Sequence, residues 1–97
     1  MKFSEIIGGS TPTLVDFYAD WCGPCKMVPP ILKEVKETLN DRIKIIKIDT
    51  EKNREVSAKY GIRSIPTMIL FKNGKSIWRQ SGVLPAPQLL KVLEQYL

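Results

Sequence analysis

The residues with the greatest chemical potential in this sequence are two cysteines, Cys22 and Cys25, three positions apart. Two thiols at this spacing can form a disulfide bond and can be reduced again. A disulfide that closes so short a loop removes little entropy from the unfolded chain, so it adds little stability. The pair is therefore interpreted as a redox-active dithiol rather than as a structural link.

Metal binding is the competing interpretation of the two cysteines. A structural zinc ion takes four ligands, usually from Cys and His, and this chain has two cysteines and no histidine. One chain cannot complete such a site, although two chains could share a metal ion in a bridged dimer. We expect a monomer with no bound metal and no cofactor other than the redox-active disulfide Cys22–Cys25.

The element after the first cysteine should position both sulfur atoms. Pro24 suits the first turn of a helix, and apolar residues spaced by three and four follow it. These residues are Met27, Val28, Ile31, Leu32, Val35 and Leu39. The pattern predicts a helix from about Pro24 to Leu39, with Cys22 at its N-terminus. Free N–H groups and the helix dipole favour a thiolate there. Cys22 is thus the predicted nucleophile, and Cys25, deeper and less exposed, is the predicted resolving thiol.

Two prolines, Pro29 and Pro30, lie inside this predicted helix. A proline in a helix interior removes one backbone hydrogen bond and crowds the preceding turn, which predicts a kink near Met27. The spacing assigns Met27, Ile31 and Val35 to the core.

Asp16 is the one charged residue in the apolar run from Leu14 to Tyr18. Such a run is typical of a buried central strand. Burial is costly for a carboxylate and raises its pKa, which would make Asp16 usable as a base near neutral pH. This interpretation is preferred to that of a solvated aspartate near a turn.

The strands should form a mixed sheet of about four. Residues 42–49 are rich in isoleucine and predict a strand parallel to 14–18, because a long helix connects the two. Asn73-Gly74 is a strong signal for a type I′ hairpin, which would join strands 68–71 and 76–79 in antiparallel fashion.

Two further helices complete the predicted α/β domain. Asn53 is a suitable N-cap for a helix over residues 54–60, which Gly61 would end. Apolar residues at helical spacing follow residues 85–87 and predict a C-terminal helix. We expect helices on both faces of the sheet.

The motif Trp21-Cys22-Gly23-Pro24-Cys25 resembles the active site of the thioredoxin family. The segments Leu14-Val15-Asp16-Phe17 and Ile65-Pro66-Thr67 resemble the same family, from about Thr13 to the C-terminus. The resemblance implies a thioredoxin-like fold.

Residues 1–12 depart from the family pattern. They leave room for one short helix that ends at Gly8-Gly9, so we expect the first family strand to be absent. The strand 42–49 would then lie at the edge of the sheet. Its charged residues Arg42, Lys44 and Lys47 are of the kind that protects an edge strand from association.

The resemblance also assigns roles to other residues. It implies that Asp16 lies behind Cys25 and accepts its proton through water, with Lys47 as a candidate partner of Asp16. It implies a cis Ile65–Pro66 peptide bond against the sulfur atoms, which would leave the Ile65 backbone open to pair with an extended substrate. The implied substrate groove consists of Trp21, Gly23, Pro24, Ile65, Pro66 and Gly82.

Two residues near this groove differ from the family pattern. Ser81 precedes Gly82 where an aliphatic residue is common, which makes the rim of the groove more polar. Tyr18 stands where many thioredoxins have tryptophan, and its hydroxyl needs a partner.

On this interpretation the protein is an enzyme, a thioredoxin-type protein-disulfide reductase whose substrates are disulfide-containing proteins. The dipeptide Gly23-Pro24 between the cysteines resembles the reducing members of the family. The resemblance implies a flavin-containing thioredoxin reductase, using NADPH, as the partner that regenerates the dithiol. The alternative is a thioredoxin-like binding or scaffold subunit in which the dithiol is incidental.

The composition indicates the number of domains and limits the kinds of partner and location that are expected. The chain has 97 residues and is expected to form a single domain, 1–97. Its formal net charge is +5, but the basic residues are scattered, so no nucleic-acid surface is predicted. It has neither a long apolar run nor a signal-peptide pattern, so no membrane association is expected. A working dithiol suits a reducing compartment, and a cytoplasmic location is expected.

Overall fold

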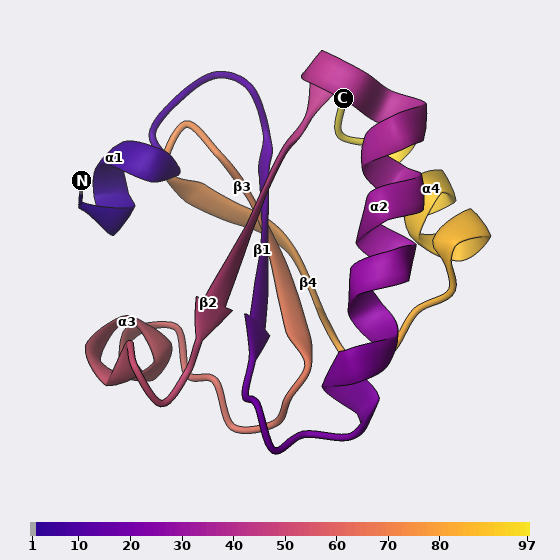
Figure 1. Ribbon diagram of the computed structural model, residues 1–97. Helices are drawn as coiled ribbons and strands as arrows, with labels where there is room; N and C mark the ends of the chain where they lie inside the picture. Colours follow the sequence, from indigo (N-terminus) through magenta and orange to yellow (C-terminus); the bar gives the residue numbers. More distant parts are fainter. Residues whose placement is uncertain (1) are drawn as a thin grey trace.

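The computed structural model describes residues 2–97; Met1, the first residue of the predicted domain 1–97, lies outside the described residues. The chain forms a four-stranded sheet with helices on both faces (Figure 1). The α-helices are α1 (Phe3–Ile6), α2 (Val28–Leu39), α3 (Arg54–Lys59) and α4 (Ala86–Glu94). The strands are β1 (Thr13–Tyr18), β2 (Lys44–Asp49), β3 (Thr67–Lys72) and β4 (Lys75–Ser81). The 3-10 helices η1 (Pro24–Met27) and η2 (Asn40–Arg42) flank α2.

The sheet has the strand order β2-β1-β3-β4. β1 is parallel to β2 and antiparallel to β3, and β3 pairs with β4 as a hairpin. The predicted mixed sheet of four strands is therefore confirmed. Within residues 2–12 the only helix or strand is α1, so the first family strand is absent from that stretch, and β2 lies at the edge as predicted.

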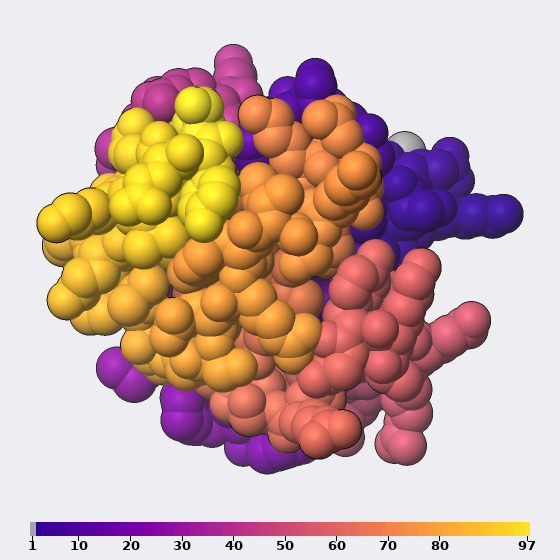
Figure 2. Space-filling model, turned by 180° about the vertical axis from the view of Figure 1, so that it is seen from behind, coloured from indigo at the N-terminus to yellow at the C-terminus, as the bar shows by residue number. Residues whose placement is uncertain are grey.

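The helices divide into two layers. α2 and α4 pack on one face of the sheet, and α1 and α3 pack on the other (Figure 1). β1 contributes to both cores because its side chains alternate between the faces. Leu14 joins the core under α2 and α4, whereas Val15 and Phe17 join the core under α1 and α3. Seen from behind, β4 (orange) lies at the surface between α4 (yellow) and α3 (salmon) (Figure 2).

The predicted helix 24–39 is divided at Met27 into the 3-10 helix η1 and the α-helix α2. Pro29 and Pro30 fall in the first turn of α2, where a missing N–H group costs nothing. The tighter 3-10 turn also shifts Met27 out of phase with the buried face. The Met27 side chain is 59% exposed, so its assignment to the core is wrong. The buried residues of α2 are Val28, Leu32, Val35 and Leu39.

Two local signals had different outcomes. Asn73 and Gly74 have φ angles of 53° and 79°, as a type I′ turn requires, so the predicted hairpin is confirmed. Asn53 does precede α3, but its side chain makes no capping hydrogen bond. Its amide instead donates to the Asp49 carbonyl over 3.0 Å, which ties α3 to the end of β2.

The buried face of α2 can be tested with one matched pair of substitutions. Leu32→Ala should lower the free energy of unfolding by about 2–5 kcal/mol, because it leaves a cavity in the core. Met27→Ala should change it by less than about 0.5 kcal/mol, because that side chain is exposed. Urea unfolding of the oxidised protein measures both, and equal losses would contradict this assignment.

Candidate active site

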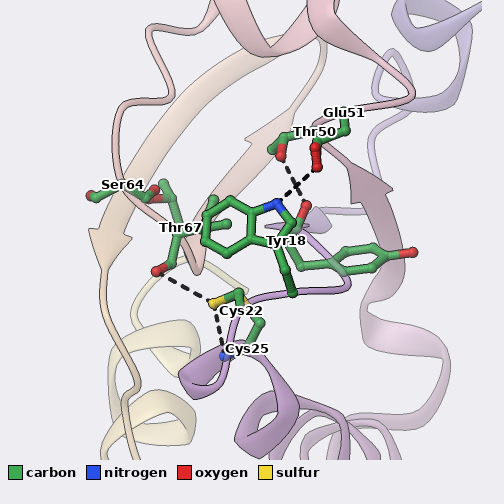
Figure 3. The surroundings of a disulfide bond; sticks show 9 residues. Tyr18, Cys22, Cys25, Thr50, Glu51, Ser64 and Thr67 are labelled. Carbon is green, nitrogen blue, oxygen red and sulfur yellow. Dashed lines mark hydrogen bonds between the residues drawn. A yellow bond between two sulfur atoms is a disulfide. The ribbon is translucent and has the colours of Figure 1, made fainter.

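The two cysteines lie beyond the carboxyl end of β1: Cys22 is in the turn that leads into η1, and Cys25 is the second residue of η1. Cys22 and Cys25 are joined by a disulfide bond, with their Cα atoms 5.3 Å apart (Figure 3). Together with Ala19 they form a small buried cluster against Tyr18 and Ile65. The end of β1 therefore positions the redox pair where the sheet meets the first turn of the α2 layer.

The sulfur of Cys22 accepts a backbone hydrogen bond. The N–H of Cys25 donates to Cys22 Sγ over 3.2 Å (Figure 3). This N–H belongs to the first turn of η1, where donors have no partner within the helix. Such a donor, with the dipole of the following helix, stabilises negative charge on Cys22 Sγ. Cys22 and Cys25 are 4% and 5% exposed, so the expectation that Cys25 is less exposed is wrong.

A second segment lies against the same sulfur atom. Ile65 and Pro66 are joined by a cis peptide bond, as the resemblance implies. The Ile65 carbonyl oxygen lies 3.8 Å from Cys22 Sγ. The N–H of Gly82 donates to the Pro66 carbonyl over 2.8 Å, and Gly82 has a φ of 89°, which favours glycine. The structure thus brings Ile65, Pro66 and Gly82 together beside Cys22.

The other predicted groove residues belong to the cysteine loop itself. Gly23 and Pro24 are exposed, and Trp21 is 71% exposed. The indole Nε1–H of Trp21 donates to the Glu51 carboxylate over 2.8 Å (Figure 3). Sequence reasoning missed Glu51. The available signal was its place just after β2, because parallel strands end at the same edge of a sheet and β1 leads to Trp21.

Asp16 is fully buried in β1. Neither of its carboxylate oxygens has a hydrogen-bond partner among the described residues. Desolvation by burial raises the pKa of Asp16 from 3.8 to about 6, and the positive charge of Lys47 opposes this rise. Its neighbour Leu14 belongs to the core under α2, so the alternation of the strand places Asp16 on the α2 side of the sheet.

Lys47 lies opposite Asp16 in the parallel register of β1 and β2. Its Nζ lies 4.7 Å from the centre of the Tyr18 ring, which is a cation–π contact. Within residues 2–97 the only ion pair joins Arg42 to Glu94. Lys47 therefore acts on Asp16 through its charge and not through a hydrogen bond.

A cavity of about 150 Å³ gives access to Cys25. Its lining residues are Tyr18, Ala19, Asp20, Cys25, Lys26, Pro29 and Lys47. This volume can hold several water molecules, each of which takes about 30 Å³ in the liquid. A larger cavity of about 440 Å³ lies between α1 and α3, and neither cysteine lines it.

The requirements of a membrane-spanning helix and of a metal site can also be compared with the described part of the chain. No helix there has the length and the apolar character needed to cross a membrane. Residues 2–97 also contain no group of three or more His, Cys, Asp or Glu side chains placed to hold a metal ion. The redox group that this site does contain is the Cys22–Cys25 disulfide.

Comparison with known proteins identifies a family and named relatives. The family model described as Thioredoxin matches residues 1–95. Thioredoxin Y, chloroplastic, from Oryza sativa subsp. japonica is 51% identical over 99% of this chain and 58% of the rice protein. Thioredoxin Y2, chloroplastic, from Arabidopsis thaliana is 52% identical over 99% of this chain and 58% of the plant protein. Thioredoxin 1 from Synechococcus elongatus is 42% identical over 96% of this chain and 87% of its own length.

These relatives correct the predicted location. The two plant proteins are named chloroplastic, so the expectation of a cytoplasmic protein is wrong. That expectation depended on the cysteine usage and the absence of a signal-peptide pattern, and neither feature distinguishes the cytoplasm from another reducing compartment. The chain spans 58% of the length of each of these two plant relatives.

Geometry and comparison agree on the chemistry of the site. A CxxC disulfide at a helix N-terminus, in a chain with thioredoxin relatives, supports a protein disulfide oxidoreductase. A scaffold role in which the dithiol is incidental is not favoured. The family model covers nearly the whole chain, and the chain belongs to the thioredoxin family.

Proposed function

We propose that this protein reduces disulfide bonds in protein substrates by dithiol–disulfide exchange. The observation that carries the proposal is the hydrogen bond of 3.2 Å from the Cys25 N–H to Cys22 Sγ. That donor stabilises a Cys22 thiolate, and the thiolate is the species that attacks a disulfide. Cys22 is therefore assigned as the nucleophile and Cys25 as the resolving thiol.

The exchange takes two steps. The Cys22 thiolate attacks one sulfur of the substrate disulfide, so a mixed disulfide forms and the other substrate sulfur leaves as a thiolate. Cys25 then loses its proton and attacks Cys22 Sγ, which breaks the mixed disulfide and releases the second substrate thiolate. Two electrons pass to the substrate, and the product is the Cys22–Cys25 disulfide that the structure contains.

Asp16 is the proposed acceptor of the Cys25 proton. With a pKa of about 6, it is mostly ionised at neutral pH and still basic enough to take a proton. The cavity lined by Cys25 and Lys47 has room for water. Asp16 does not line this cavity but lies directly opposite Lys47 in the strand register. Lys47 keeps the carboxylate ionised, because its positive charge opposes the rise in the pKa of Asp16.

The proposed substrate surface surrounds the Cys22 sulfur. The Ile65 N–H donates to no backbone carbonyl within residues 2–97, so it is free to pair with an extended substrate segment. A Cβ atom on Gly82 would meet nothing within 4 Å, so a side chain there would project into the open space above the groove. Backbone pairing makes few demands on sequence, which suits varied substrates. The proposed groove consists of Trp21, Gly23, Pro24, Ile65, Pro66 and Gly82.

The disulfide must be reduced again after each turnover. We propose thioredoxin reductase, a flavoprotein that uses NADPH, as the partner, on the basis of family membership and the Gly23-Pro24 dipeptide. Residues 1–97 are proposed to act as one domain and as a monomer. The formal net charge of +5 would speed encounter with acidic partner surfaces.

The roles of the two cysteines can be separated by serine substitution. Cys22→Ser should abolish the protein's acceleration of insulin-disulfide reduction by dithiothreitol, because the attacking sulfur is gone. Cys25→Ser should still attack but should accumulate a mixed disulfide that it cannot resolve. Non-reducing mass spectrometry detects this adduct. Each variant is the matched control for the other, and trapping by Cys22→Ser alone would reverse the two assignments.

The buried carboxylate predicts a pH dependence of stability. The folded-state pKa of Asp16, about 6, lies above the ordinary 3.8, so ionisation opposes folding as the pH rises between these values. One pKa unit corresponds to about 1.4 kcal/mol. Asp16→Asn should therefore gain stability relative to the unsubstituted protein by up to about 3 kcal/mol between pH 4 and pH 8.

Urea unfolding of both oxidised proteins at several pH values measures this difference, and the other titrating groups cancel in the comparison. A difference that is constant from pH 4 to pH 8 would show that Asp16 titrates normally. The same variant should slow the resolution of the mixed disulfide near neutral pH, because the proton acceptor is lost.

A further inference from the structure

The segment that carries the cis peptide is connected to the end of β4 by side-chain hydrogen bonds. The hydroxyl of Thr67 donates to the Ser64 carbonyl over 2.7 Å. The same Thr67 oxygen lies 3.0 Å from the Ser81 hydroxyl oxygen. Ser64 and Thr67 flank the turn that passes beside Cys22 (Figure 3). Thr67 and Ser81 are also the last residue pair in the β3–β4 register.

The direction of the Ser81 hydrogen bond follows from counting hydrogen atoms. A threonine hydroxyl has one hydrogen, and a carbonyl oxygen can only accept. Thr67 therefore uses its hydrogen on Ser64, and Ser81 must donate to Thr67. The result is a directed chain from Ser81 through Thr67 to the Ser64 carbonyl, in which each bond polarises the next.

This chain and a separate backbone hydrogen bond hold the two sides of the cis peptide. Ser64 precedes Ile65, and the Pro66 carbonyl on the other side accepts the Gly82 N–H over 2.8 Å. The residue pair Ser81 and Gly82 at the end of β4 thus holds the backbone before and after Ile65. The Ile65 carbonyl lies 3.8 Å from Cys22 Sγ.

The burial of Thr67 makes this hydroxyl depend on Ser81 as its hydrogen-bond donor. Thr67 is fully buried, so its oxygen cannot turn to solvent for a replacement donor when Ser81 is truncated. Without Ser81 the Thr67 hydroxyl still donates to the Ser64 carbonyl, but it no longer accepts a hydrogen bond, so the bond to Ser64 loses the polarisation that Ser81 supplies. Ser81 is exposed at the groove rim, so its own solvation does not require the bond.

We propose that Ser81 is a positioning residue for disulfide exchange, which fixes the Ile65 backbone at the distance from Cys22 that substrate pairing needs. This inference rests on the proposed reductase function. It differs from the expectation that Ser81 only makes the groove rim more polar, because its hydrogen is committed inward to Thr67. The predicted effect is on the capture of substrate and not on the chemistry of Cys22 and Cys25.

The test compares Ser81→Ala with Ser81→Thr and Ser76→Ala. Ser81→Ala should raise KM for insulin reduction about fivefold and leave kcat unchanged, the factor expected for one hydrogen bond of about 1 kcal/mol. Ser81→Thr keeps the hydroxyl and should restore the unsubstituted KM. Ser76→Ala changes an exposed serine of the same strand and should have no effect on KM.

Amide hydrogen exchange of the oxidised protein gives a readout that does not depend on activity. Ser81→Ala should speed exchange at the Gly82 N–H about fivefold and leave α4 unchanged. An unchanged KM for Ser81→Ala, or unchanged exchange at Gly82, would overturn the inference even if the variant melts earlier. Failure of the unsubstituted protein to reduce insulin would instead defeat the proposed function, and the exchange measurement would still test the hydrogen-bond chain.

Discussion

The position of the active site depends on β1, which is hydrogen-bonded on both sides by β2 and β3. Its residues from Thr13 to Phe17 are fully buried. A strand held at both edges cannot slip by one residue without turning every side chain to the wrong face. Its carboxyl end therefore delivers the cysteine loop to a fixed place. The end of β2 and the start of β3 reach the same edge, which brings Glu51 and Pro66 to the loop.

The burial that fixes β1 also makes the ionised Asp16 side chain unfavourable for folding. An apolar residue would suit this position in the core, because a carboxylate without a hydrogen-bond partner opposes folding once it is ionised. The raised pKa of Asp16 reflects this cost of burying the charged carboxylate. Such departures from the stable choice are expected where a side chain serves chemistry. The cavity at Cys25 and the charge of Lys47 lie on the same side of the sheet as Asp16, which is the side where the proposed mechanism needs a base.

The sequence predicted those features that depend on local pattern or on the family motif. The cysteine pair, the hairpin at Asn73-Gly74 and the buried Asp16 belong to this group. Met27 was misassigned because helical spacing assumes one kind of helix, whereas a 3-10 turn precedes α2. Glu51 and the hydrogen bond of Ser81 depend on segments that meet only in the folded sheet. Periodicity within one segment carries no information about such contacts.

The two sulfur atoms differ in the groups that surround them. Cys22 and Cys25 are almost equally buried, so exposure alone would select neither as the nucleophile. Cys22 Sγ accepts a hydrogen bond from the Cys25 N–H and lies 3.8 Å from the Ile65 carbonyl oxygen, and this N–H would stabilise a negative charge on the sulfur. Cys25 lines the cavity together with Lys47, which lies opposite Asp16 in the strand register. In the proposed mechanism, attack by Cys22 and deprotonation of Cys25 therefore use separate groups, so the two steps do not compete for the same charge.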